Sequence, residues 1–202
     1  MEEFSTVFYF VPDKADDVEK NLDEFSARIL DIFLFLPERI KEISVVCNGI
    51  TTNYYRYTES KLSEYGETRI RIGKECSGEK EEKRFFIWEK IASDSEREEI
   101  YSSAPPKIKQ RDPLKITIAL APDDTDNEGI YFCDLPTEES TGMNLYVDAN
   151  FHIRSDRKSI HFDNDYNKKL LDFCASAVKD IVHWVLDVNN GVPCAETATL
   201  IK

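Results

Sequence analysis

The chain has 202 residues, of which 41% are hydrophobic and 11% aromatic, so it is long and apolar enough to fold around a core of its own. Its formal net charge of -13 repels nucleic acid and anionic membranes unless a local basic patch reverses the field. We therefore expect a folded protein whose partners include neither nucleic acid nor a membrane.

The cysteines indicate a reducing compartment. The five thiols are widely spaced, odd in number and free of any CxxC pair, which is typical of reduced, partly buried cysteines rather than of a disulfide framework. The first residues lack the basic segment and the long apolar core of a signal peptide. The most apolar run, Ile29–Leu36, is too short to span a bilayer. These features predict a cytoplasmic protein.

The N-terminal segment predicts a strand, a helix and a second strand. Thr6–Val11 is rich in β-branched and aromatic residues, which favours a strand. Because it begins almost at the first residue, we interpret it as the last strand of a preceding domain or as an edge strand that pairs with another domain. Apolar residues at helical spacing predict a helix from Asp16 to Pro37, where proline ends it. Ile43–Cys47 predicts the next strand.

Residues 50–100 predict an antiparallel meander. We expect the charged, glycine-containing segment 73–83 to be a solvated hairpin loop, and Asp94–Glu99 to be a short exposed helix. The candidate strands are Thr52–Tyr57, Thr68–Ile72 and Arg84–Glu89.

The C-terminal half predicts three strands and a long helix. Leu114–Leu120 alternates clearly between apolar and other residues. Ile130–Cys133 and Asn144–Ile153 follow, with an acidic loop between them. Tyr166–Val188 has a helical apolar stripe, and residues 164 and 165 (Asn-Asp) can cap it. The fold class is therefore α+β, with a β-α-β start, an antiparallel or mixed sheet and a long C-terminal helix.

No complete catalytic or cofactor motif is present. The chain contains no GxSxG, no GxxxxGK[ST] and no GxGxxG, and its seven glycines are too few for a glycine-rich nucleotide loop. The acidic loop at 123–128 has the composition of a calcium site without its spacing, which favours a solvated loop. We expect no enzyme activity from this chain alone and no cofactor bound to it.

Two of the three histidines are expected to approach each other. His152 and His161 flank a turn, with Asp156 and Asp163 nearby. A metal site requires tighter spacing or a second pair of ligands, so the pattern favours a surface or capping role.

A basic turn follows the strand at 144–153 and is the main candidate site. It gathers Arg154, Arg157 and Lys158 in a protein that is otherwise acidic. One interpretation is an ion pair between these side chains and the neighbouring acids at 156, 163 and 165, or burial of their aliphatic stems. The other is a cationic finger that contacts a phosphate bound elsewhere. Two further basic clusters, 69–74 and 107–111, are explained by strand alternation and by a loop.

Residues 129–171 resemble a pattern of sacsin-type proteins, which carry an ATPase domain of the GHKL class. The pattern is an aromatic strand ending in Leu-Pro, an acidic loop, a Thr-Gly pair, an apolar strand, a Ser-Asp-Arg turn and an aromatic-Asn pair that opens a helix. The matching residues are Tyr131–Pro136, Thr141-Gly142, Leu145–Phe151, Ser155-Asp156-Arg157 and Tyr166-Asn167, with Leu170-Leu171.

The resemblance implies a position after the nucleotide pocket. The ATP-binding motifs of the class are missing, TVFYFVP resembles the last strand of the ATPase domain, and the rest resembles a middle, or transducer, domain of the ribosomal-protein-S5-like α+β type. Residues 1–12 would then be that last strand, 13–190 the middle domain and 191–202 a tail.

By the same resemblance, the chain is a non-catalytic module that couples ATP binding and hydrolysis in an adjacent GHKL domain to conformational change or binding of a protein client. ATP and Mg²⁺ would belong to the parent protein, and the isolated chain would neither bind nor hydrolyse ATP. Arg157 is the first candidate for contact with the γ-phosphate, followed by Arg154 and Lys158. The alternative is a self-standing protein-interaction module that uses the strand Thr6–Val11 and an acidic surface.

Overall fold

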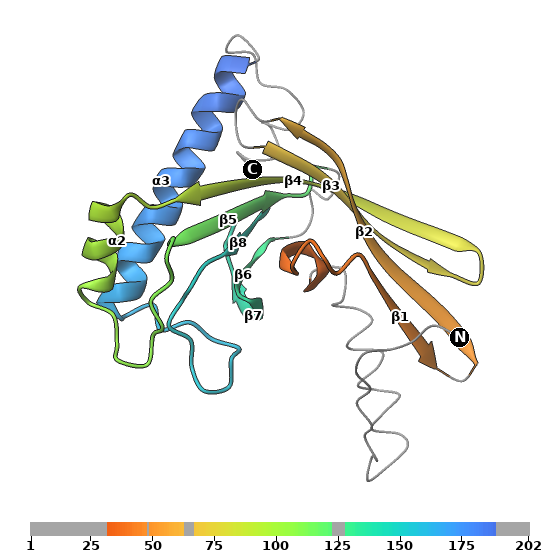
Figure 1. The fold of residues 1–202 in the computed structure, drawn as a ribbon, viewed down its shortest axis with the longest axis horizontal. Coiled ribbons are helices and arrows are strands. Elements are labelled where there is room, and N and C mark those ends of the chain that lie inside the picture. Colours follow the sequence, from red (N-terminus) through yellow and green to blue (C-terminus); the bar gives the residue numbers. More distant parts are fainter. Residues whose placement is uncertain (1–31, 48, 63–66, 123–127, 189–202) are drawn as a thin grey trace.

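The computed structural model describes residues 32–47, 49–62, 67–122 and 128–188, which form one eight-stranded sheet with α2 and α3 on one face and the helical residues 32–35 on the other (Figure 1). The strand order is β1-β2-β3-β4-β5-β8-β6-β7. Neighbouring strands are antiparallel except β6 and β8, which run parallel. The predicted α+β class, with a mostly antiparallel sheet and a long C-terminal helix, is confirmed.

The strands are β1 (Glu42–Cys47), β2 (Ile50–Leu62), β3 (Glu67–Cys76), β4 (Glu79–Ile91), β5 (Lys115–Leu120), β6 (Ile130–Cys133), β7 (Leu135–Ser140) and β8 (Leu145–Asp148), and the helices are α2 (Asp94–Tyr101) and α3 (Asp165–Val188). The predicted strand Thr6–Val11, the predicted helix up to residue 31 and the tail 191–202 lie outside the described residues. Residues 32–35 are helical.

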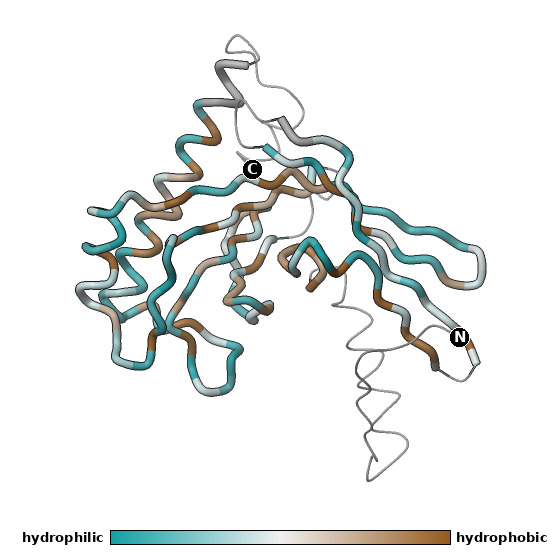
Figure 2. Tube along the Cα trace, viewed as in Figure 1, coloured by the Kyte–Doolittle hydropathy of each residue, from teal (hydrophilic) through white to brown (hydrophobic). Residues whose placement is uncertain are grey.

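The central strands bury both of their faces. In β4, Phe86 and Trp88 belong to the core under α2 and α3, whereas Phe85 and Ile87 belong to a second core on the opposite face. Phe33 and Leu34, both fully buried, cover that second face. This follows from the two-residue period of a strand, which sends successive side chains to opposite faces. Figure 2 shows the apolar residues gathered where β4, β5 and α3 meet.

Helix α3 begins where the sequence predicts. The side chain of Asn164 accepts a hydrogen bond from the backbone N–H of Tyr166 at 3.0 Å, which caps the first turn. The apolar stripe that packs on the sheet consists of Leu170, Phe173, Cys174, Ala177 and Ile181.

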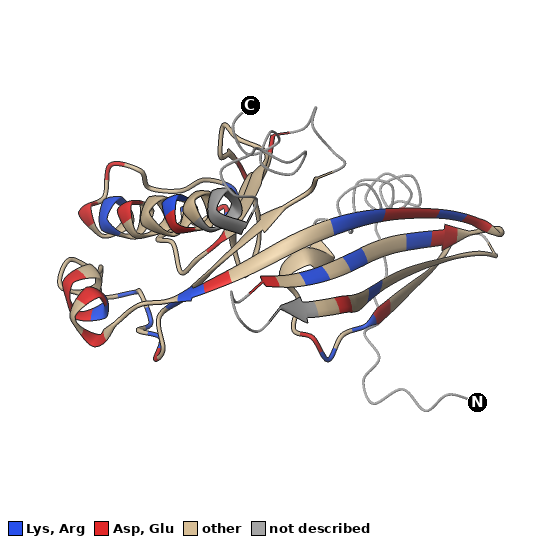
Figure 3. Ribbon diagram, turned by 90° about the horizontal axis from the view of Figure 1, so that it is seen from above, with Lys and Arg blue, Asp and Glu red and all other residues tan. Residues whose placement is uncertain are grey.

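The charged segment 73–83 is not the predicted loop. It forms the ends of β3 and β4, joined by the two-residue turn Ser77-Gly78, whose φ angles are 52° and 86°. Positive φ at both central residues matches the twist of an antiparallel hairpin. Opposite charges pair across the two strands: the Lys74 ammonium group lies 3.4 Å from the Glu81 carboxylate. Figure 3 shows this alternation of basic and acidic residues along the arm that β2, β3 and β4 form.

Two predictions within residues 129–162 need correction. The expected acidic loop contains β7, Leu135–Ser140, an edge strand that pairs with β6. The expected strand Asn144–Ile153 leaves the sheet after Asp148, because the Phe151 N–H turns back to the Ala149 carbonyl at 2.8 Å. The apolar residues of that segment, Leu145, Val147, Ala149 and Phe151, are nevertheless all buried in the core under α3.

Candidate functional site

The basic turn is a closed backbone structure. The Arg154 N–H donates to the Ser159 carbonyl at 2.8 Å, and the Arg157 N–H donates to the Arg154 carbonyl at 3.0 Å. The carboxylate of Asp156 accepts from the Lys158 N–H at 2.9 Å. Arg157 itself has a φ of 61°, in the left-handed region that non-glycine residues rarely occupy. The orientation of the Arg157 backbone is therefore fixed by the turn.

Lys158 connects the basic turn to the edge strand β7 through two contacts with Glu138. Its ammonium group lies 2.7 Å from the Glu138 carboxylate, and its carbonyl accepts the Glu138 N–H at 2.7 Å. Of the three predicted phosphate-contacting residues, Lys158 is thus already neutralised by an acid.

Arg154 and Arg157 differ from Lys158. Both are exposed, and neither forms an ion pair with any residue in the described ranges. Four other arginines of the described residues do have a carboxylate beside them. Arginines with such a partner are Arg69, Arg71, Arg97 and Arg111. The turn therefore presents two guanidinium groups whose charge is available to an external anion.

Asn167, the second residue of the aromatic-Asn pair, fixes the base of the turn from α3. Its side-chain oxygen accepts the His152 N–H at 2.8 Å, and its amide nitrogen lies 2.8 Å and 3.0 Å from the carbonyl oxygens of His152 and His161. Asn167 is fully buried. The expected approach of the two histidines is confirmed, since their ring centroids lie 4.6 Å apart.

The loop after α2 brings Lys107 to the same region. Lys107, His152, Ser155 and His161 line one cavity, so part of the basic cluster 107–111 lies beside the basic turn. The sequence did not predict this contact, because 45 residues separate Lys107 from His152 and no local pattern relates them. Arg111, from the same cluster, instead pairs with Asp134 at 2.8 Å.

A second cavity, of about 360 Å³, contains several charges but no free cation among the described side chains that line it. Arg56 donates to the Leu36 carbonyl at 2.7 Å, and Arg111 and Lys115 are paired with Asp134 and Glu89. Burial raises the pKa of Asp148, which also lines this cavity, to about 6. The cationic groups that line this cavity are therefore already bound to acids or to backbone carbonyls.

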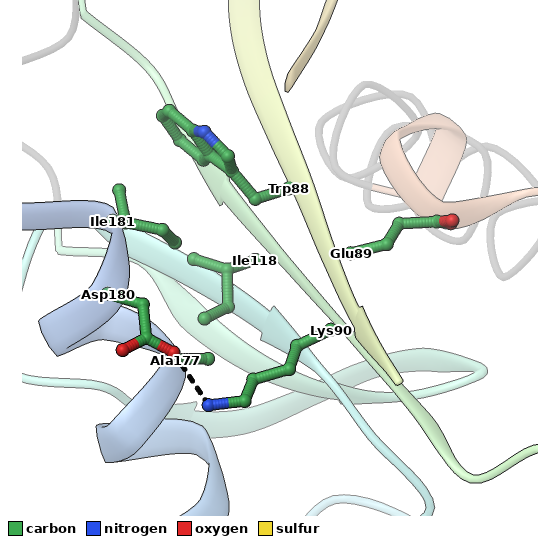
Figure 4. A pocket seen from close by; sticks show the side chains of 7 residues that line it. All are labelled: Trp88, Glu89, Lys90, Ile118, Ala177, Asp180 and Ile181. Atoms are coloured by element: carbon green, nitrogen blue, oxygen red, sulfur yellow. Dashed lines mark hydrogen bonds and ion pairs between the residues drawn. The ribbon is translucent and has the colours of Figure 1, made fainter. Parts of the chain in front are cut away.

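A third cavity, of about 290 Å³, lies between β4 and α3 and is mostly apolar (Figure 4). Trp88 and Ile181 line one part of it. In the other part of the cavity, the Lys90 ammonium group lies 2.7 Å from the Asp180 carboxylate. The groups that line it offer no nucleophile and no metal-binding set.

The two buried cysteines, Cys133 and Cys174, have no features of reactive thiols. Burial raises the pKa of Cys133 to about 11 and that of Cys174 to about 12. Within the described ranges, no group of three or more His, Cys, Asp or Glu side chains is arranged to hold a metal ion. Most of the acidic loop at 123–128 lies outside those ranges.

In comparisons with known proteins, no family model, no curated protein and no solved structure matches the chain. Among the described helices, none has the length and apolar character needed to cross a membrane.

Proposed function

We propose that this chain is the non-catalytic middle module of a sacsin-like GHKL ATPase, in a ribosomal-protein-S5-like arrangement. It couples ATP binding and hydrolysis in a neighbouring nucleotide-binding domain to a conformational change or to binding of a protein client. ATP and Mg²⁺ are held by that neighbour, and the setting is cytoplasmic. The proposal accounts for the sequence pattern at 129–171.

The observation that carries the proposal is the pair of exposed arginines on a turn of fixed backbone. Arg157 and Arg154 have no carboxylate partner among the described residues, whereas Lys158 does. A guanidinium that is not neutralised within its own domain can form bidentate hydrogen bonds to a phosphate presented by another domain.

Charge that develops on the γ-phosphate oxygens during transfer is stabilised by a fixed cation. In this role Arg157 donates hydrogen bonds to those oxygens. Its backbone is kept in place by the left-handed turn, by the hydrogen bond from the Lys158 N–H to Asp156 and by the hydrogen bonds of Asn167 at the base of the turn. Arg154, on the same turn, adds positive charge at the same surface. Neither residue provides a nucleophile or a base, so the role is one of positioning and electrostatic stabilisation.

The proposal has a direct test in the isolated chain and in its gene. We expect the isolated chain to show no ATP turnover, and we expect the coding sequence before residue 1 to encode a GHKL nucleotide domain. ATP hydrolysis by the isolated chain would contradict the proposal, and so would a native start at Met1 with no such domain.

One observation favours the alternative, a self-standing protein-interaction module. Val46 in β1 and Ile50 in β2 are 67% and 54% exposed, and within the described residues β1 pairs on one side only. An open strand edge with apolar neighbours can add a strand from a partner. A native start at Met1 would favour this function.

A further inference from the structure

The cavity between the loop after α2 and the turn after β8 has the size of a small-molecule site. Its volume is about 450 Å³, within the range of about 300 to 1,000 Å³ that is common for ligand pockets. Its polar groups come from Lys107, His152, Ser155 and His161. Arg154 and Arg157 do not line it, so the cavity is separate from the surface described under the proposed function.

The backbone segments that carry the two imidazole rings are held together before any ligand arrives. Their centroids are 4.6 Å apart and their planes are inclined by 31°. The backbone segments that carry them are joined by the His161 N–H, which donates to the His152 carbonyl at 3.1 Å, and by the buried amide of Asn167. A preorganised pair of this kind loses little entropy when it binds.

One ring nitrogen of a residue that lines this cavity lacks a partner. His152 Nδ1 is buried and forms no hydrogen bond within the described part of the chain. A buried polar atom without a partner costs about 1–3 kcal/mol, so such atoms usually mark a bound water or ligand. Lys107, Ser155 and His161 also line the cavity and carry polar side chains.

The charges around the pair distinguish an anion from a cation as the ligand. The pKa of His152 is lowered, first by burial and then by His161 and Lys107, and no carboxylate raises it. The acids on the neighbouring segments have other partners or are exposed: Asp156 caps the Lys158 N–H, Asp165 pairs with Lys168, and Asp163 is exposed. The remaining bases nearby are Arg154, Arg157 and Lys158, of which Lys158 pairs with Glu138. Lys107 lines the cavity and no carboxylate is among its described lining residues, which favours an anion over a metal ion as the ligand.

The apolar residues that line the cavity indicate which class of anion would bind there. Ile108, Phe151 and Ile153 line the cavity together with the cationic groups. A free inorganic anion would leave this surface uncovered, whereas an ester with an organic group would bury it.

We propose that this cavity binds a phosphate monoester, with the phosphate against Lys107, His152, His161 and Ser155 and the organic group against Ile108 and Phe151. The proposal does not rest on the γ-phosphate role of Arg157. It requires only this chain. Because a phosphate dianion favours the protonated imidazoles, binding strengthens as the pH falls towards 6.5.

The test is an NMR titration of the purified chain with phenyl phosphate, with inorganic phosphate and with Zn²⁺ in parallel. His183, exposed on α3, is an internal reference because the chain has only three histidines. We expect phenyl phosphate to shift the ring signals of His152 and His161 saturably, and to bind roughly fivefold or more tightly at pH 6.5 than at pH 8.5. Inorganic phosphate should bind more weakly. No saturable shift, equal binding of the two phosphates, or saturation by Zn²⁺ alone would overturn the proposal.

Two lysine variants complete the test. Lys107→Gln should weaken phenyl phosphate binding by about tenfold, which is the effect of losing about 1.4 kcal/mol. Lys109→Gln is the matched control, since Lys109 is exposed on the same loop and does not line the cavity. An equal loss in both variants would show that only the general charge of the loop matters and would contradict a built site.

Discussion

The side chain of Asn167 and the backbone of His152 form a reciprocal pair of hydrogen bonds, both 2.8 Å long, from residues fifteen positions apart. Asn167 opens α3, whereas His152 lies in the segment that leads into the basic turn. The pair therefore links the helix that covers the sheet to the turn that carries Arg154 and Arg157.

Replacing this amide should destabilise the protein and loosen the turn. We expect Asn167→Ala to lower the free energy of unfolding by about 2–4 kcal/mol, because it removes three hydrogen bonds and leaves the part-buried His152 N–H and His161 carbonyl without their partner. Denaturant unfolding measures the loss, and the ring signals of the two histidines should change at the same time. Asn53→Ala is a control, because the Asn53 side chain bonds Ser44 at an exposed site, and it should cost less than about 0.5 kcal/mol. Similar losses in both variants would contradict the linkage.

Gly129 is required by the close approach of two backbone segments. A Cβ atom at this position would lie 1.9 Å from the Leu145 carbonyl oxygen, so Gly129→Ala must displace β6 from β8. We expect a loss of about 2 kcal/mol or more in the free energy of unfolding. Gly142→Ala is the matched control, since Gly142 has a φ of 70° but open space around it, and should cost about 1 kcal/mol. The account of this contact fails if Gly142→Ala is the more damaging change.

Asp148 should make stability depend on pH. Burial raises its folded pKa to about 6, above the unfolded value of about 3.9. The protonated form therefore favours folding, and this advantage is complete below about pH 4 and lost as the pH rises through about 6. Asp148→Asn should remove the dependence, so that the variant gains on the order of 2–3 kcal/mol relative to the original chain between pH 4 and pH 7.

The measurement for Asp148 is denaturant unfolding of both proteins at the two pH values. Asp156→Asn serves as the control, because Asp156 is exposed and an asparagine can also accept the Lys158 N–H. If Asp148→Asn shows no gain at pH 7 over pH 4, the carboxyl group is not held in a desolvating site.

The sequence predicted those elements whose local pattern matches their environment. Leu114–Leu120 alternates because β5 buries two faces of unequal polarity, and the stripe of α3 is visible because one face packs on the sheet. β7 was missed because its residues, with Pro136 and two glutamates, read as a loop. Proline is tolerated there because β7 is an edge strand. The ends of β3 and β4 were missed because both faces are charged.

The candidate site was predicted only in its local part. The turn and the approach of His152 to His161 follow from a short separation along the chain. The roles of Asn167 and Lys107 depend on tertiary contacts, and a single sequence contains no signal for them. Lys158 has a carboxylate partner, Glu138 of β7, and Arg157 has none within the described residues. This difference also depends on the position of β7.

The central claim is that Arg157 presents its charge to a phosphate held by a neighbouring nucleotide domain. The most direct measurement is the ATP turnover rate of the complete protein that carries that domain, compared between Arg157→Ala and Arg39→Ala. Arg39 is also exposed and without a carboxylate partner among the described residues, but it lies before β1. We expect Arg157→Ala to lower kcat by at least about tenfold, since a cationic finger typically contributes more than this, and Arg39→Ala to leave it unchanged. Equal rates in the two variants would contradict the account.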